Sequence, residues 1–121
     1  MARRSVPRRA EAPAARDTYV DAVLARYRSA PGALGHVRKA DVRLARDLYH
    51  RGVPLSVVED AITVALCRRL VRAAPPLEPV RSLHYFVPVI DELLAGALAP
   101  DYVAYLRGCL ERHLTKHASA R

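Results

Sequence analysis

Apolar positions recur every three or four residues along most of the chain, which is the spacing of one face of an α-helix. The longest such run extends from Leu55 to about Arg72, with Ser56 and Glu59 at the spacing of a capping box at its start. This run predicts a central helix, with Ile62 in the middle of its buried face. No segment alternates apolar and polar residues for long enough to predict a strand, so the expected fold class is all-α.

Further helices are predicted on either side of the central one, separated by Gly and Pro. The first begins at Asp17 or Thr18, and the second spans about 38–51. Pro88 lies inside a later apolar stretch, which is either one kinked helix or a short turn followed by a helix that starts at Pro88. The last helix begins at Pro100, and its predicted inward residues are Tyr102, Val103, Leu106, Leu110 and Leu114. Together they predict a compact bundle of about five helices.

Three parts of the 121-residue chain differ in composition. Residues 1–14 contain four Arg and two Pro with no apolar periodicity, which predicts a disordered basic arm. Residues 15–117 then form a single helical domain, long enough for one modest core. Prolines within 74–81 make that connector stiff and extended.

Arginine dominates the charge of the chain. It supplies 18 of the 20 basic residues, there is no Asn or Gln, and 12 acidic residues leave a formal net charge of +8. A guanidinium group binds phosphate oxygens in a planar fork, whereas Asn and Gln are the side chains that read adenine edges. This composition favours contact with a nucleic-acid backbone over sequence readout. The competing explanation is GC-rich coding DNA, in which Arg, Ala, Pro and Val are abundant.

The candidate nucleic-acid contacts fall in the basic arm, on the second helix, at the end of the central helix and just after the proline connector. If the second and central helices pack as a hairpin, the basic residues at 38–39 and 68–72 form one patch. The alternative is a solvated helix end, where cations complement the helix dipole. The full candidate set is Arg3, Arg4, Arg8, Arg9, Arg38, Lys39, Arg43, Arg46, Arg68, Arg69, Arg72 and Arg81.

The join at residues 48–58 is similar to a helix-turn-helix, because Gly52 is followed by an apolar residue and a capped helix. Other features fit this motif less well. Leu48 occupies a position where a small residue normally sits, and Glu59 and Asp60 near the start of the second helix of the motif would repel DNA phosphates. An ordinary helical hairpin is the alternative.

Cys109, His113 and His117 are spaced four residues apart, on one face of the last helix. Zinc accepts such ligands, but a structural site needs a fourth, such as His84 or Cys67. The alternative is a small core cysteine with surface histidines, and we predict no metal and no cofactor. Two cysteines are too few for a disulfide framework, which favours a reduced, cytoplasmic setting.

No catalytic constellation stands out in the sequence. Adjacent carboxylates at Glu59-Asp60 and Asp91-Glu92 diverge on a helix, and there is no glycine-rich phosphate loop or nucleophile elbow. No apolar stretch approaches the roughly 20 residues of a membrane helix. We therefore predict a non-enzymatic protein that does not enter membranes.

Residues 45–94 resemble the helical domain of DnaD-type bacterial replication-initiation and helicase-loading proteins. The resemblance rests on the Gly-Val-Pro-Leu turn and Val-Val-Glu-Asp-Ala-Ile helix at 52–62, and on a Ser-x-x-Tyr-Phe segment at Ser82, Tyr85 and Phe86. The chain departs from the family in lacking its terminal aromatic signature, as there is no Trp. The resemblance implies a helical domain that binds DNA without strong sequence preference and contacts replication or mobile-element machinery.

From these features we expect a small nucleic-acid-binding accessory protein that grips the phosphate backbone, with DNA favoured over RNA. Two alternatives stay open: a helical adaptor subunit of a larger nucleoprotein complex, and a sequence-specific helix-turn-helix regulator. A salt titration of DNA binding distinguishes the three, because backbone contacts give a steep salt dependence without sequence preference.

Overall fold

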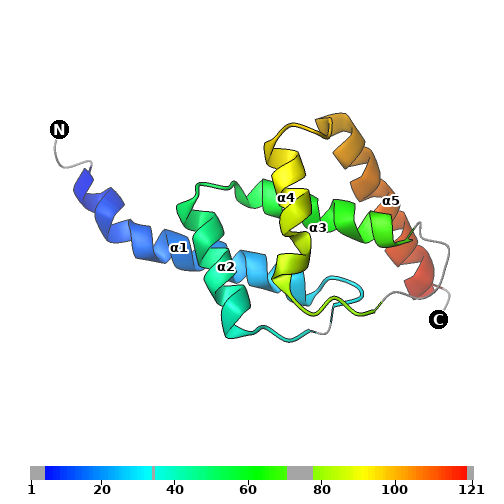
Figure 1. Cartoon of the computed structure of the whole chain (residues 1–121), viewed down its shortest axis with the longest axis horizontal. Helices are drawn as coiled ribbons and strands as arrows, with labels where there is room; N and C mark the ends of the chain where they lie inside the picture. The colour runs from blue at the N-terminus through cyan, green and yellow to red at the C-terminus, as the bar shows by residue number, and fades with distance from the viewer. Residues whose placement is uncertain (1–4, 34, 71–77, 120–121) are drawn as a thin grey trace.

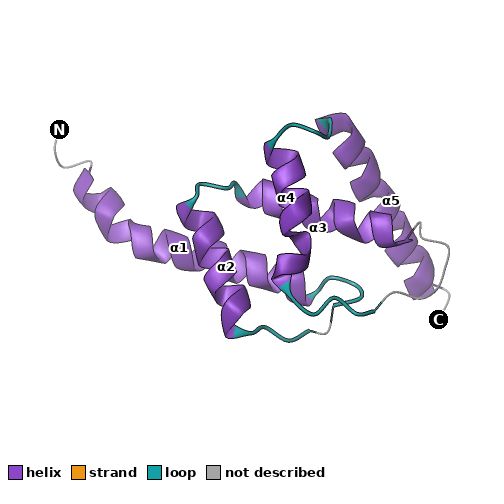
Figure 2. Cartoon of the chain, viewed as in Figure 1, coloured by secondary structure: helices purple, strands orange, loops and turns teal. Residues whose placement is uncertain are grey.

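The computed structural model describes residues 5–33, 35–70 and 78–119, with side chains from residue 14 to residue 115 within these ranges. Every regular element in these ranges is helical (Figures 1 and 2), which confirms the all-α prediction and the number of helices. The elements are α1 (Ser5–Arg28), α2 (Lys39–His50), α3 (Leu55–Leu70), the short 3-10 helix η2 (Leu83–Phe86), α4 (Val87–Leu94) and α5 (Pro100–Ser119). None of the described helices is long and apolar enough to cross a membrane.

The central element of the bundle is α3, as the sequence predicted (Figure 1). It packs against α1, α4 and α5, and all residues from 61 to 67 are buried. A helix that is buried nearly all round belongs to the interior of a domain instead of its surface. Ile62 is fully buried in this segment, which confirms the predicted core position.

The start of α1 differs from the prediction. The helix begins at Ser5 instead of Asp17 or Thr18, so the backbone of residues 5–14 is helical where the sequence predicted a disordered arm. Ala and Arg, which dominate this stretch, are strong helix formers. Pro7 lies in the first turn, where the backbone N–H has no helical partner to lose. Among the described side chains of α1, the core residues are Val20, Val23, Leu24 and Tyr27.

The later helices follow their predicted boundaries. Of the two alternatives for Pro88, the second is confirmed: η2 forms a short turn, and α4 then begins at Val87 with Pro88 in its first turn. The helix α5 begins at the predicted Pro100. The proline connector is described only from Glu78, and Pro75 and Pro76 lie outside the described residues.

The helix α2 packs against α1 and η2 but does not run along α3. Figure 1 shows it lying across α1. The antiparallel hairpin of the second and central helices, on which a single basic patch was predicted, is therefore wrong. The join turns the chain away at Gly52, so the two helices contact other elements instead of each other.

A buried carboxylate fixes the start of α2 to the second half of the chain. Asp41 is fully buried, although the sequence pattern assigned only apolar side chains to the inward face. Its carboxylate accepts hydrogen bonds from the backbone N–H of Arg38 and of Leu83, both at 2.9 Å, and from the hydroxyl of Ser82 at 3.2 Å. Burial, and after it the charge of Asp41, raises the pKa of the neighbouring Tyr27 hydroxyl. This contact places the segment before η2 beside the first turn of α2.

Candidate nucleic-acid interface

The solvent face of α2 carries a row of basic side chains. Lys39, Arg43, Arg46 and His50 follow one another at intervals of four, three and four residues, which places them on one face of the helix. All four are exposed, and the buried residues of α2 lie on the opposite face. We call Lys39, Arg43 and Arg46 the basic stripe. Within the described residues, none of these three forms an ion pair, and Asp47 is exposed on the same helix.

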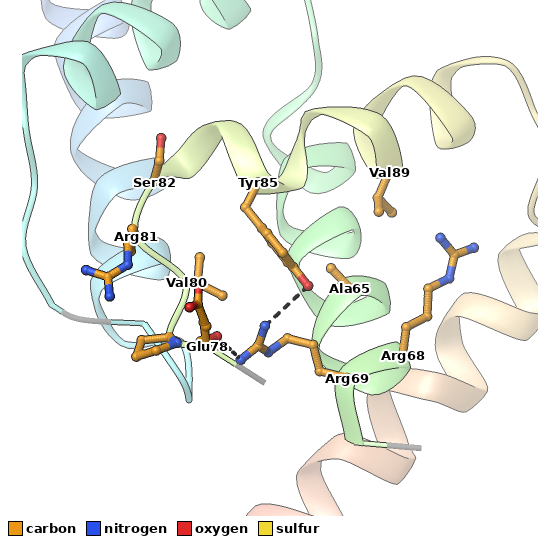
Figure 3. Close-up of a pocket in the computed structure, with 10 residues that line it drawn as sticks. Ala65, Arg68, Arg69, Glu78, Val80, Arg81, Ser82, Tyr85 and Val89 are labelled. Carbon is orange, nitrogen blue, oxygen red and sulfur yellow. Dashed lines mark hydrogen bonds between the residues drawn. The ribbon is translucent and has the colours of Figure 1, made fainter. Parts of the chain in front are cut away.

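The basic stripe is continued at its start by Arg38 and Arg81. Arg38 precedes α2 and is exposed. Arg81 is exposed and directly precedes Ser82, which is bonded to Asp41 in the first turn of α2. In Figure 3, Arg81 points away from Arg69 and Tyr85. The predicted contacts at Arg38, Lys39, Arg43, Arg46 and Arg81 are thus exposed and lie on or next to one helix.

Arg68 is exposed at the end of α3, but its charge is already matched. It forms a two-fold ion pair with Glu92 of α4, with Nη1–Oε2 and Nη2–Oε1 distances of 2.8 Å. The hydrogen bonds of this pair raise the pKa of Arg68 and lower the pKa of Glu92. Arg68 therefore attracts an external anion less strongly than the residues of the basic stripe do, because Glu92 already neutralises its charge.

Arg69 is held in place by the segment that follows the proline connector (Figure 3). Its guanidinium lies over the ring of Tyr85, 5.5 Å from the centroid, and donates to the Tyr85 hydroxyl at 3.3 Å. It also donates to the carbonyl of Glu78 at 2.9 Å. Val80, between these two contacts, donates its N–H to the carbonyl of Gly32 at 2.7 Å. Arg69 thus fastens residues 78–85 to the end of α3.

A groove of about 790 Å³ lies where these contacts meet (Figure 3). Both Arg69 and Arg81 line it, so the end of α3 and the start of α2 are linked through residues 78–85 instead of through a hairpin. The remaining lining residues are Ala65, Arg68, Glu78, Pro79, Val80, Ser82, Tyr85 and Val89.

Several predicted contacts cannot be placed. Arg3, Arg4 and Arg72 lie outside the described residues, as do the side chains of Arg8 and Arg9. Their assignment to nucleic-acid contact stays a prediction.

The described part of the chain contains no group of three or more His, Cys, Asp or Glu side chains placed to hold a metal. Cys67 is buried, which raises the pKa of its thiol, and it donates to the carbonyl of Leu106 at 3.3 Å. Cys109 accepts a hydrogen bond from Arg112 at 3.3 Å. The side chain of His117, a candidate zinc ligand, lies outside the described residues.

Exposed aromatic side chains are the surface feature that the sequence pattern missed. Tyr102 was predicted to face inward on the last helix, but it is 49% exposed, and Tyr105 on the same helix is 62% exposed. The helix α5 has apolar side chains on more than one face, and among its described side chains only Val103 and Leu110 are buried. The sequence did contain a signal for these exposed rings: the last helix has more apolar and tyrosine residues than one buried stripe can hold.

Comparison with known proteins adds no family assignment, since no family model, curated protein or solved structure matches the chain. The resemblance of residues 45–94 to DnaD-type helical domains therefore stays a prediction. The charged and aromatic surfaces of the domain are the features that bear on its function.

Proposed function

We propose that this protein is a nucleic-acid-binding accessory domain that contacts the phosphate backbone with little sequence preference. The basic stripe on α2 is the observation that supports this proposal best. Its three cations are exposed and have no ion-pair partner in the described residues, whereas Arg68 and Arg107 are paired with Glu92 and Asp60. Unpaired cations keep their full charge for an external anion.

The length of the stripe suits a nucleic-acid backbone. At 1.5 Å per residue, the distance along α2 from Lys39 to Arg46 is about 10 Å. A DNA duplex presents one phosphate charge per roughly 1.7 Å of its axis, so a row of this length faces several phosphates at once. Arg38 and Arg81 extend the positive surface beyond the start of the helix. The absence of Asn and Gln from the whole chain supports backbone contact over base readout.

The burial of α3 argues against the helix-turn-helix alternative. A recognition helix has to enter the major groove with an exposed face, but α3 is covered by α1, α4 and α5. Its residues 61–67 are all buried.

A role in replication or in a mobile genetic element rests only on the DnaD-type resemblance, and DNA is favoured over RNA on the same ground.

A salt titration of binding to a random-sequence duplex tests the proposal. Each phosphate contact contributes about 0.9 to the slope of log K against log salt for duplex DNA. We expect the triple variant K39A/R43A/R46A to reduce this slope by roughly 2–3 units, with the same loss on unrelated sequences. The control R16A/R28A/R107A removes the same charge from other surfaces and is expected to keep most of the slope. Equal slopes for the wild type and the stripe variant would contradict the proposal.

A further inference from the structure

Three of the six tyrosines are exposed, and one of them, Tyr85, lies against an arginine. Tyr85 is 44% exposed and Tyr102 and Tyr105 are 49% and 62% exposed. The other three, Tyr19, Tyr27 and Tyr49, lie on α1 and α2 and are buried or half-buried. The exposed tyrosines are therefore concentrated on the half of the molecule that contains the end of α3, η2 and α5.

A chain of contacts connects these tyrosines with arginines. The Arg69 guanidinium lies over the Tyr85 ring. Cys67, one residue before Arg68, donates a hydrogen bond to the carbonyl of Leu106, which places the end of α3 beside the helix that carries Tyr102 and Tyr105. Tyr102 and Tyr105 stack, with centroids 6.5 Å apart and an interplanar angle of 23°. Tyr105 lies four residues before Cys109 on the same face of α5, and Cys109 accepts a hydrogen bond from Arg112 at 3.3 Å. We call this surface the aromatic–arginine track; its members are Tyr85, Arg69, Arg68, Tyr102, Tyr105 and Arg112.

We propose that the aromatic–arginine track is a second site that binds single-stranded nucleic acid, and this proposal rests on the proposed function. Unpaired bases expose their flat faces, and proteins that bind single strands stack such bases on aromatic side chains while cations contact the phosphates. A duplex hides those faces in its own stack. The rings of Tyr102 and Tyr105 are exposed and nearly parallel, with an interplanar angle of 23°, so together they offer a flat aromatic surface on which bases can stack.

The charge of the track favours a nucleic acid over another protein as its occupant. It contains three arginines, and among its described neighbours Glu92 matches only Arg68. An apolar protein surface would remove water from Arg69 and Arg112 and offer no acceptors in place of their hydrogen bonds to water. A strand of phosphates supplies such partners along its length.

The track is separate from the basic stripe. The helices α2 and α5 do not pack together, and in the view of Figure 1 α4 lies between them. The stripe contains cations without aromatic rings, whereas the track contains both arginines and tyrosines. Duplex and single-stranded binding can therefore be changed independently by substitution.

The test compares a labelled oligothymidylate of about 20 nucleotides with a duplex of equal length, by fluorescence anisotropy. One stacked base corresponds to roughly 5- to 100-fold in affinity, so Y102A/Y105A is expected to weaken single-strand binding by at least about tenfold. The matched variant Y102F/Y105F keeps both rings and is expected to stay within about twofold of the wild type. Duplex affinity is expected to change by less than about twofold in both variants, because the rings carry no charge. Circular dichroism confirms that each variant is folded.

A second readout follows tyrosine emission directly, because the chain contains no Trp. Stacking on thymine bases is expected to quench the tyrosine emission of the wild type. The emission of Y102F/Y105F is expected to be quenched less, because phenylalanine does not emit at the tyrosine wavelength. An unchanged single-strand affinity in Y102A/Y105A would overturn the track, and if K39A/R43A/R46A still loses duplex binding, the proposed function stands. Equal losses in the Phe and Ala variants would also overturn it, because the hydroxyls would then be responsible. A wild type that binds neither nucleic acid would overturn both proposals.

Discussion

The carboxylate of Asp41 accepts the backbone N–H of Leu83 at 2.9 Å, although the two residues are 42 positions apart in the sequence. Asp41 belongs to the first turn of α2, and Leu83 begins η2. Both residues are buried. This contact joins the helix that carries the basic stripe to the segment that lines the groove.

We predict that Asp41→Ala destabilises the domain by about 2–4 kcal/mol. The substitution leaves the buried N–H of Leu83 without its acceptor, and a buried donor without a partner costs roughly 1–3 kcal/mol. Asp41→Asn keeps one side-chain oxygen and is expected to cost less. Urea denaturation of both variants measures the free energy of unfolding. A cost below about 0.5 kcal/mol for Asp41→Ala would place Asp41 among ordinary surface positions.

The ion pair of Arg68 and Glu92 predicts a pH dependence of stability. Hydrogen bonds from Arg68 lower the pKa of Glu92 from its ordinary value of 4.5. The folded state therefore binds this proton more weakly than the unfolded state, and stability rises with pH through this range. The contribution is present above about pH 4.5 and is lost as the pH falls through the lowered pKa of Glu92.

The variant Glu92→Gln measures this contribution. We expect it to melt at a lower temperature than the wild type at pH 7, and the two melting temperatures to converge as the pH falls through the lowered pKa of Glu92. The pair is exposed, so the difference at pH 7 is expected to be small. Asp101→Asn, which changes an exposed carboxylate in the first turn of α5, serves as the control for a general charge effect. A difference that stays constant from pH 3 to pH 7 would contradict the assignment to Glu92.

Ile62 provides a prediction about the core. Ile62→Ala is expected to destabilise the domain by about 2–5 kcal/mol, because it leaves a cavity in the most buried part of α3. Ile62→Val removes a single methylene from the same site and is expected to cost about 0.5–1.5 kcal/mol. Thermal or urea unfolding followed by circular dichroism measures both. Similar costs for the two variants would mean that the core around α3 closes over the missing volume.

The helices could be predicted from the sequence because their signals are local. Apolar spacing identified α3 and Ile62, and the fixed geometry of proline gave the starts of α4 and α5. The early start of α1 was missed because two prolines and the absence of apolar periodicity outweighed the helix propensity of the alanines and arginines. Local spacing contains the information for these elements, whereas their ends depend on weak and competing preferences.

The surface could be predicted only in part, because its contacts connect distant residues. The outward face of α2 followed from helical spacing alone. The partners of Arg68 and Arg69 are 24 and 16 residues away, and no local pattern shows that Glu92 and Tyr85 come to meet them. Asp41 looked like one more polar residue in a first turn, where carboxylates are common. Its burial depends on the packing of η2, which only the three-dimensional structure contains.

The helix that carries the basic stripe lies between two glycines whose backbones are in the left-handed region. Gly35 has a φ of +81° and Gly52 a φ of +76°, and a Cβ at either position would meet nothing within 4 Å. A larger side chain would therefore fit at both positions. Glycine is favoured there by the backbone conformation, because other residues adopt it only with strain. The charges on α2 are free to vary one at a time without disturbing the core. Two uncharged positions form the turns on either side of that helix, so the charge of the basic stripe and the placement of the helix rest on different residues.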